Sequence, residues 1–452
     1  MKNSIRHSLA TVIITISVLV FSANDSFADP YAKFKGTTLK VSWPTLSHFH
    51  KAKKLVQEFT DETGIKVIID YSPYLQLRDK QINEMSKPTG EIDVVSWVIM
   101  WKGEYVTKGL LTPLSQFFAS PQLVNPQYDL WDISNAYLQS GGIVGGSKGY
   151  LPGKSGALYG IPFGAETSIL AYRKDIFEEL NLPVPRTYDD VYSAAQIIHE
   201  KRGMGGLTMR GKSGHQITAA WLFHAAPMGA KVFDKDWNPI FNNNAGVRTA
   251  QFLRDMVKYG PNGIPSYGFK EMTTAFLQGD AAMYIDSIKI ASMVRDPALS
   301  KVDGKVGYAL HPTDRRCGAE TGGFAMGIPA NSINKEAAFQ FIQWMTGKKA
   351  DRRMVELGGD PIRLSTLRDL ELSKKFPEFL VVAEQLGHCA DPDWRPLIPE
   401  WNELNVEVLG TALTEVIITD HPIKPILDKA AVKARAIMQR EGYYQWRKLQ
   451  SD

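Results

Sequence analysis

Glu166 is the acidic residue whose position in the sequence most suggests binding chemistry. It lies in residues 156–180 (GALYGIPFGAETSILAYRKDIFEEL), between two runs with strand composition at residues 157–161 and 168–172. An acidic residue beside two small ones is a poor pattern for the buried middle of a strand. It is typical of a strand that leaves one domain, crosses a cleft and enters another. A carboxylate there accepts hydrogen bonds from hydroxyl groups, although a surface carboxylate or a salt bridge within the crossing fits the same pattern.

Aromatic and basic side chains near the expected ends of strands supply further candidate contacts. Aromatic faces pack against the C–H surfaces of polyhydroxylated ligands, and polar groups then fix the hydroxyls. Loops at strand ends open onto the cleft of an open α/β sheet. The candidates chosen this way are Trp43, His48, Trp97 and Trp101. Trp221 on an expected helix of the second domain, Trp401 near the C-terminus and Arg210 in a loop are further candidates. The alternatives are core packing for each tryptophan and a solvated loop for His48, so we expect two or three of the five tryptophans to line the cleft.

Residues 206–213 (GLTMRGKS) match the pattern of a phosphate-binding P-loop. That motif requires a strand before its first glycine and a helix at the Lys-Ser pair. Here the expected strand, residues 207–209, lies inside the pattern, which disfavours nucleotide binding. We predict instead that Arg210, Lys212 and His215 belong to a loop near the cleft.

Two other catalytic patterns are disfavoured in a similar way. Residues 145–149 (GGSKG) match the nucleophile elbow G-x-S-x-G, but glycines and prolines on both sides predict a loop rather than a strand–turn–helix. The nine histidines include no His-x-x-x-His pair, and no Cys-x-x-Cys spacing occurs. A structural or catalytic zinc site therefore lacks its ligands.

Strand and helix patterns alternate along the chain, which predicts an α/β fold. Apolar residues at helical spacing, Ala52, Leu55, Val56 and Phe59, predict a helix after the first strand. Thr187, with Asp190 three residues later, is close to a capping box and predicts the start of another helix. Strand-like runs occupy residues 38–42, 65–69, 92–97, 207–209, 281–285, 306–311 and 324–328, and residues 113–156 are predicted to be loop.

The N-terminus has the three parts of an export signal. Lys2 and Arg6 precede an apolar run at residues 9–21, and Ser26-Phe27-Ala28 has the small residues of a cleavage site. We therefore predict a signal peptide over residues 1–28. No cysteine lies near the cleavage site, so the mature protein is expected free in the periplasm, without a lipid anchor.

Length, charge and cysteine content narrow the class of protein further. The chain of 452 residues exceeds the size at which a single core stops growing, so two domains are expected. A formal net charge of +4 is too small to argue for a nucleic-acid partner. Cys317 and Cys389 either form a disulfide in the oxidising periplasm or remain two separate buried thiols.

The chain resembles the periplasmic sugar-binding proteins of ABC importers (extracellular solute-binding family 1, the maltose-binding type). The crossing segment at residues 156–180 carries the resemblance, together with residues 322–365 (GGFAMGIPANSINKEAAFQFIQWMTGKKADRRMVELGGDPIRLS) and a block from Arg395 to Tyr444. Each motif is degenerate, but their order and spacing are specific, and they span almost all of the mature chain. The segments RGKSGHQITAAWLF, GAKVFDKDWNPIF and AAMYIDSIKIASMV look most like the branch that carries sugar alcohols and monosaccharides.

The resemblance implies a two-lobe fold of the periplasmic binding protein type II kind, with each lobe a sheet flanked by helices. The implied N-terminal lobe comprises residues 29–163 and 328–372, and the C-terminal lobe residues 166–322 and 377–452. It favours ligand contact by Glu166, Asp286, Gly323 and Arg363. Capping of a helix is the alternative for Asp286, and pairing with an acid such as Asp360 is the alternative for Arg363.

The function that the resemblance implies is binding and release without catalysis. The protein would act as a monomer without a cofactor or metal, and it would deliver a carbohydrate or sugar alcohol to an ABC permease. The basic residues Arg363, Lys289 and Lys212 leave an anionic sugar open as the ligand. A periplasmic glycoside-processing enzyme is the alternative, because two carboxylates and an arginine around a cleft also suit a glycosidase. A surface adhesin would need repeats or an anchor, and neither is visible.

Overall fold

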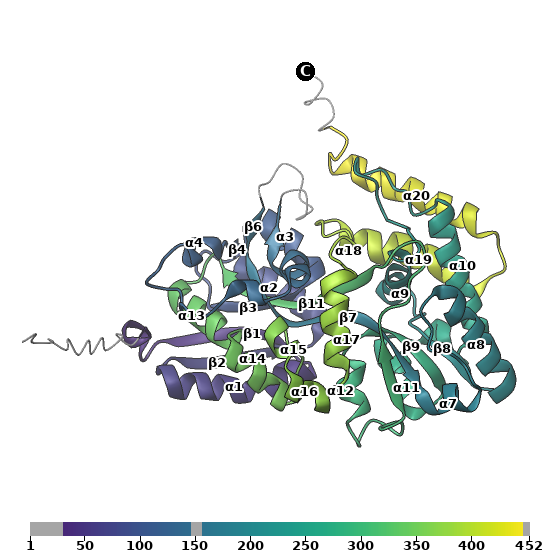
Figure 1. The fold of residues 1–452 in the computed structure, drawn as a ribbon. Coiled ribbons are helices and arrows are strands. Elements are labelled where there is room, and N and C mark those ends of the chain that lie inside the picture. The colour runs from purple at the N-terminus through teal and green to yellow at the C-terminus, as the bar shows by residue number, and fades with distance from the viewer. Residues whose placement is uncertain (1–29, 146–155, 446–452) are drawn as a thin grey trace, which may run out of the picture.

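A computed structural model of the chain describes residues 30–145 and 156–445. The predicted signal peptide and most of the G-x-S-x-G pattern lie outside these residues. Two lobes lie side by side, one coloured mainly purple and blue and the other mainly teal and yellow (Figure 1). None of the helices in the described ranges is long and apolar enough to cross a membrane.

One sheet of ten strands runs through both lobes. Its main path has the order β2-β1-β3-β11-β7-β9-β8, and β4, β10 and β12 pair beside this path. Strands β1 and β2, β1 and β3, and β8 and β9 are parallel, whereas β11 is antiparallel to both β3 and β7. The strands are β1 (Thr38–Pro44), β2 (Lys66–Ser72), β3 (Val94–Val98), β4 (Leu111–Thr112), β7 (Gly160–Arg173), β8 (Gly205–Thr208), β9 (Ala281–Ser287), β10 (Val306–Ala309), β11 (Ala319–Pro329) and β12 (Ala390–Asp391).

Strands β7 and β11 connect the lobes. The first half of β7 pairs with β11, and its second half pairs with β9 on one side and β10 on the other. The two runs predicted at residues 157–161 and 168–172 are therefore largely one strand, preceded by a small hairpin of β5 (Ile143–Val144) and β6 (Ala157–Leu158). Pro162 and Gly164 do not end the strand, because pairing with β11 continues past them.

The first lobe is built around one large apolar cluster. The predicted stripe Ala52, Leu55, Val56 and Phe59 is buried there, on the inner face of α1 (Ser47–Thr63). The segment predicted as loop at residues 113–156 contains short helices and β5 where it is described. The other helices of this lobe are α2 (Tyr74–Met85), α3 (Lys102–Thr107), α4 (Ser115–Phe118), α5 (Asn135–Tyr137), α13 (Lys335–Met345), α14 (Lys348–Glu356), α15 (Leu364–Leu367) and α16 (Leu370–Lys375).

The second lobe has its own apolar cluster and the predicted capping box. Asp190 N donates to Thr187 Oγ1 at 3.1 Å and Thr187 N donates to Asp190 Oδ2 at 2.9 Å, which starts α8 (Tyr188–Arg202). The other helices are α7 (Lys174–Glu179), α9 (His215–Ala225), α10 (Asn244–Tyr259), α11 (Phe269–Gln278), α12 (Ile290–Val294), α18 (Trp401–Glu403), α19 (Gly410–Ile418) and α20 (Ile423–Arg440). Single turns of 3-10 or π-helix complete the two lobes at Ala32–Phe34, Ile99–Trp101, Leu130–Asp132, Leu138–Gly142, Ile264–Ser266 and Leu404–Leu409.

Helix α17 (Glu378–His388) lies between the lobes (Figure 1). Its residues Phe379, Val382 and Leu386 belong to the apolar cluster of the first lobe, whereas the sequence placed residues 377–452 in the second. A disulfide joins Cys317 to Cys389, with the two Cα atoms 5.1 Å apart, and so fixes the end of α17 beside the start of β11. Of the two states left open for these cysteines, the structure contains the bonded one.

Candidate functional site

A cleft of about 320 Å³ opens between the lobes, beside the crossing strands. The first lobe contributes the start of α1, Tyr74 and the turn Gly358–Asp360, and the second lobe contributes polar and aromatic side chains. The crossing strands form the floor. The lining residues used below are His48, Lys51, Tyr74, Glu166, Arg210, His215, Gln216, Phe223, Phe269, Lys289, Asp296, Glu320, Gly322, Gly323, Phe324, Asp360, Trp394 and Arg395.

Glu166 stands on β7 opposite Gly322 of β11, and its carboxylate is held by two groups, one from the last residue of β9 and one from just after this strand. The hydroxyl of Ser287 donates to Glu166 Oε2, and Lys289 Nζ lies 3.1 Å from the same oxygen. Burial lowers the pKa of Lys289, but Glu166 and Asp360 outweigh burial and raise it overall. A carboxylate and an ammonium group therefore face the cleft together, which suits the acceptor and donor sides of hydroxyl groups.

Arg210 follows β8 and reaches Asp286 at the end of β9. Arg210 Nε donates to Asp286 Oδ2 at 2.8 Å, and Nη2 donates to Oδ1 at 2.6 Å. The two residues meet because parallel strands end at the same edge of a sheet. Burial raises the pKa of Asp286 even though Arg210 acts in the opposite direction. The guanidinium also lies over the rings of Phe223 and Phe269.

The P-loop pattern does not form a phosphate cradle. Strand β8 ends at Thr208, inside the pattern, and α9 begins only at His215. We expected this segment to lie near the cleft, and two of its residues, Arg210 and His215, do line the cleft. Burial, followed by the charges of Arg395 and Arg210, lowers the pKa of His215 to about 3, so its imidazole is neutral at pH 7.

His48 lines the cleft from the first turn of α1. The backbone N–H of Asp360 donates to His48 Nδ1 at 3.3 Å, and the Oδ2 atom of the same residue lies 3.7 Å from this nitrogen. Burial lowers the pKa of His48 despite the nearby Asp360 carboxylate. His48 Nε2 is buried without a hydrogen-bond partner. His48 is therefore a buried, neutral imidazole that presents one unpartnered nitrogen at the cleft.

Glu320 and Arg395 are the other buried ionisable groups of the lining. Burial, and then the charge of Glu166, raises the pKa of Glu320 well above its ordinary value. Burial lowers the pKa of Arg395 to about 10, so the guanidinium remains a cation at pH 7. Trp394 supports the guanidinium, which lies 4.1 Å from the Trp394 ring centroid, and its indole donates to the carbonyl of Thr321 at 2.8 Å.

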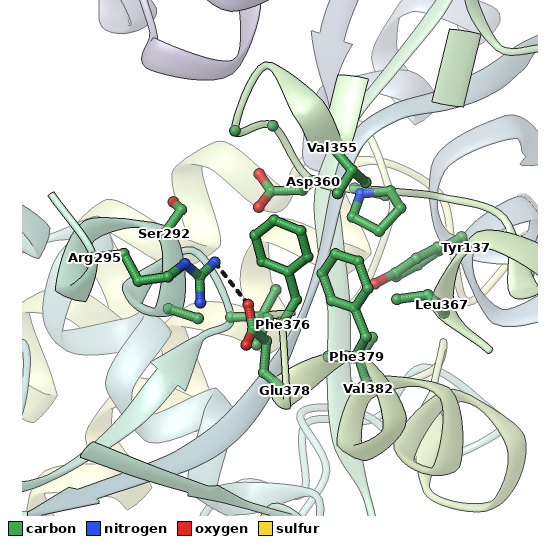
Figure 2. A pocket seen from close by; sticks show the side chains of 16 residues that line it. Tyr137, Ser292, Arg295, Val355, Asp360, Leu367, Phe376, Glu378, Phe379 and Val382 are labelled. Carbon is green, nitrogen blue, oxygen red and sulfur yellow. Dashed lines mark ion pairs between the residues drawn. The ribbon is translucent and has the colours of Figure 1, made fainter. Parts of the chain in front are cut away.

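A second, much smaller cavity of about 30 Å³ lies behind the Gly358–Asp360 turn (Figure 2). Arg295, next to α12, forms an ion pair with Glu378 of α17 at 2.8 Å and lies over the ring of Phe376. This volume is roughly a tenth of that of the cleft, so it suits a packing contact between the lobes rather than a solute.

Four of the predicted residues, His48, Glu166, Arg210 and Gly323, line the cleft. Two more lie directly behind the lining, where Asp286 holds Arg210 and Trp101 stacks on Tyr74 with 5.7 Å between ring centroids. Whether any of the six contacts a ligand stays a prediction.

Four of the predicted tryptophans require correction, because their side chains are fully buried away from the lining. Trp43 packs against Phe49 and Phe163 in the core of the first lobe. Trp97 lies against the backbone of the crossing strands, where glycines leave room for its ring. Trp221 donates its indole N–H to the carbonyl of Gly246. Trp401 belongs to the apolar cluster of the second lobe.

Arg363 also lies away from the cleft, fully buried in the first lobe. It donates to the carbonyls of Thr346 and Asp129 and pairs with Asp132 rather than with Asp360. Arg363 therefore holds segments of the first lobe together. This agrees with the alternative of pairing with an acid, but the acid is Asp132 and not Asp360.

The sequence prediction did not include Tyr74, Lys289, Glu320, Trp394 or Arg395 among the site residues. One signal for Glu320 was present, because the tripeptide Ala-Glu-Thr occurs at residues 165–167 and again at residues 319–321. The two copies lie on adjacent crossing strands, and Thr167 is paired with Thr321. Thr167 Oγ1 donates to the carbonyl of Glu320 at 2.6 Å.

Within the described residues, no group of three His, Cys, Asp or Glu side chains is arranged to hold a metal ion. The chemistry available in the cleft is therefore that of paired charges, neutral donors and aromatic faces. These groups can bind a polar solute through many hydrogen bonds while its C–H surface packs on rings.

The family model described as "Bacterial extracellular solute-binding protein" matches residues 44–352. A probable amino-acid ABC transporter periplasmic-binding protein from Sinorhizobium fredii is 25% identical, covering 93% of this chain and 94% of the relative. The mannitol-binding protein of Pseudomonas aeruginosa is 27% identical, covering 98% of this chain and all of the relative. An ABC transporter solute-binding protein from Agrobacterium radiobacter, solved in complex with ribitol, is 29% identical with a TM-score of 0.78, covering 89% of this chain and 99% of that structure.

Proposed function

This chain belongs to the bacterial extracellular solute-binding protein family, and we propose that it is the periplasmic binding component of an ABC importer for a carbohydrate or sugar alcohol. It captures the solute in the cleft between the lobes and delivers it to the membrane permease. Relatives named for mannitol binding and solved with ribitol support this class of ligand.

The observation that carries the proposal is the set of polar groups brought together where the two crossing strands run through the cleft. Glu166 with Lys289 offers an acceptor and a donor, and His48 offers an unpartnered ring nitrogen. Adjacent hydroxyls each donate and accept one hydrogen bond, so they match this mixture. An unmatched buried donor or acceptor costs about 1–3 kcal/mol, which is how such a site rejects solutes with other hydroxyl patterns.

Closure of the lobes follows from this arrangement. The first lobe contributes His48 and Tyr74, and the second contributes Arg210 and Lys289. A solute that contacts both sets binds a closed form better than an open one, and it therefore shifts the population towards closure. The closed form is then what the permease recognises. No bond in the solute is broken, so the cycle is binding and release.

A thermal-shift screen over sugar alcohols, monosaccharides and amino acids tests the proposal, followed by calorimetry on each compound that raises the melting temperature. A solute at 100 times its Kd should stabilise the protein by about 2.7 kcal/mol. Failure of every sugar alcohol and sugar, with a shift from an amino acid, would contradict the proposed ligand class. X-ray scattering with the identified solute should give a smaller radius of gyration, and incubation with activated glycosides should release no product.

Export is the remaining part of the proposal, and the three-part leader supports it. N-terminal sequencing of protein from the periplasmic fraction should begin at Asp29. Full-length protein found only in the cytoplasm, with Met1 intact, would contradict the role in import.

A further inference from the structure

Some cationic side chains of the cleft form an ion pair or a hydrogen bond with an oxygen atom of the protein, and one does not. Arg210 is bound by both oxygens of Asp286, and Lys289 is bound by Glu166. Lys51 Nζ donates to the carbonyl of Gly358 at 2.6 Å. Arg395 has no such partner in the part of the chain that the structure describes.

Arg395 is only 6% exposed, yet its guanidinium forms no ion pair with a described carboxylate. The one hydrogen bond it makes to the described residues is a weak contact from Nη1 to Met100 Sδ at 3.8 Å. Its Nε is buried without an acceptor. A buried charge is costly unless it is paired and hydrogen-bonded. The guanidinium of Arg395 therefore gains its hydrogen-bond acceptors only when a ligand that carries them enters the cleft.

The groups near Arg395 are donors as well. Glu320 is 2% exposed, has no cation within ion-pair distance among the described residues, and has an unpartnered Oε1. Burial and the charge of Glu166 raise its pKa well above the ordinary value, which favours the protonated carboxyl, whereas the charge of Arg395 acts in the opposite direction. Tyr74, which also interacts electrostatically with Arg395, presents a phenol whose pKa burial raises. A guanidinium, a carboxylic acid and a phenol form a donor-rich part of the lining.

We propose that the solute is a sugar acid, a polyhydroxylated chain or ring with one carboxylate group that Arg395 binds. The inference rests on the proposed function and narrows its ligand class. A carboxylate matches the two parallel N–H groups of a guanidinium and accepts a short hydrogen bond from a carboxylic acid. The hydroxyls of the same solute contact Glu166 and Lys289, whose charges already balance one another.

Matched ligand pairs test the inference directly. Calorimetry at pH 7.5 compares ribonate with ribitol, mannonate with mannitol and gluconate with glucitol, where the partners differ only in one terminal carbon. In the best-binding pair the acid should bind at least about tenfold more tightly than the alcohol, because a charge-assisted hydrogen bond is about twice as strong as a neutral one. An alcohol that binds as tightly as its acid, or more tightly, overturns the inference while leaving the proposed function intact.

Two variants show whether Arg395 is the responsible group. Arg395→Gln should weaken binding of the acid by about 10- to 100-fold and binding of the alcohol by less than about threefold. Lys53→Gln, which removes the same charge from an exposed position of α1, should change neither affinity. Equal losses for acid and alcohol in Arg395→Gln, with an unchanged melting temperature of the empty protein, would make Arg395 a hydroxyl donor and overturn the inference. Absence of binding by every member of the three pairs would count against the proposed function itself.

Discussion

Arg210 and Asp286 form a two-pronged ion pair at the edge of the cleft, with 2.8 Å from Nε to Oδ2 and 2.6 Å from Nη2 to Oδ1. Only Arg210 faces the cleft, and Asp286 is buried behind it. Asp286 therefore orients a side chain of the lining, and direct contact between Asp286 and the solute, which the sequence suggested for both residues, stays a prediction.

Removal of Asp286 should destabilise the protein. Asp286→Ala leaves a nearly buried guanidinium without its counter-ion, so the free energy of unfolding should fall by about 3–5 kcal/mol. Urea denaturation measures the change. Glu336→Ala is a matched control, because it breaks an ion pair with Lys33 whose side chains are about half exposed, and it should have far less effect. Equal losses in the two variants would contradict the structural role of Asp286.

Glu166→Ala should weaken binding of the solute by about 10- to 100-fold, because each hydrogen bond to a charged group contributes about 1.5–3 kcal/mol. Calorimetry measures the affinity. The variant should also be less stable than wild type, because Lys289 loses the carboxylate that holds it. A cleft-facing acid bound only by water would show no such loss. Unchanged affinity would make Glu166 a residue of the structure alone.

Acid should destabilise the protein through its buried neutral histidines. Burial is the main cause that lowers the pKa of His215 and of His311 to about 3. An unfolded histidine has a pKa of about 6.5, so below that pH the unfolded chain binds protons that the folded chain excludes. The stability from these residues is complete above pH 6.5 and is lost as the pH falls towards 3. At pH 5 each of the two histidines should have lowered the free energy of unfolding by about 2 kcal/mol.

Urea denaturation of two variants at pH 7.5 and pH 5.0 tests this assignment. His311→Gln keeps a polar side chain near Ser168 and Tyr188, the hydrogen-bond partners of His311, but it cannot be protonated, so the loss between the two pH values should shrink by about 2 kcal/mol. His421→Gln changes an exposed histidine and should leave the loss as in wild type. The same pH dependence in wild type and His311→Gln would contradict the prediction.

The sequence predicted the fold well where the signal is local. The stripe Ala52, Leu55, Val56 and Phe59 and the capping box at Thr187 depend on residues three or four apart, and both are found in the structure. The sequence indicated two strand-like runs joined by a crossing segment, and the structure shows that this segment is part of one strand, β7. The partner that pairs with β7 along this segment, β11, begins more than 150 residues later in the chain.

The site was less predictable, because its chemistry depends on contacts between distant segments. Tryptophan occurs both in protein cores and on ligand-binding faces, so the residue type alone does not distinguish the two. Only the tertiary structure shows that Trp43 and Trp97 are fully buried. Arg395 follows only the two-residue strand β12, which no strand pattern in the sequence predicted, so reasoning from strand ends did not place it in the cleft. Glu320 could have been found from the repeated Ala-Glu-Thr tripeptide on the two crossing strands.

Loss of the disulfide should lower stability without changing the cleft. Cys317 and Cys389 are 72 residues apart, and closure of a loop of this length stabilises by about 4 kcal/mol in the chain-entropy model. Neither cysteine lines the cleft. The double variant Cys317→Ser with Cys389→Ser should therefore unfold at lower urea but bind the solute with the affinity of wild type. Reducing agent should destabilise wild type and leave the double variant unaffected, and equal effects on both would contradict the pairing.

Gly323 should be intolerant of any side chain, because the crossing strands leave no space for one. Its φ is +82°, and an added Cβ would lie 2.3 Å from the carbonyl oxygen of Gly164 and 2.8 Å from Ala165 Cα. The register of β11 against β7 shifts between Gly323 and Ala325, so this close approach lies at an irregularity in the strand pairing. Gly109 has a similar φ of +69° with nothing within 4 Å, which makes Gly109→Ala a control for the conformational cost alone.

Gly109→Ala should lower the free energy of unfolding by about 1–2 kcal/mol, the cost of a left-handed conformation for a residue with a Cβ. Gly323→Ala should lower it by clearly more, because the contact with the backbone of β7 adds to that cost. It should also weaken solute binding, since Glu166 on β7 stands opposite Gly322 and would move with the strand. Urea denaturation gives the first comparison and calorimetry the second. If the two variants lose equal stability and Gly323→Ala keeps the affinity of wild type, the close approach of β7 and β11 is not what places Glu166 in the cleft.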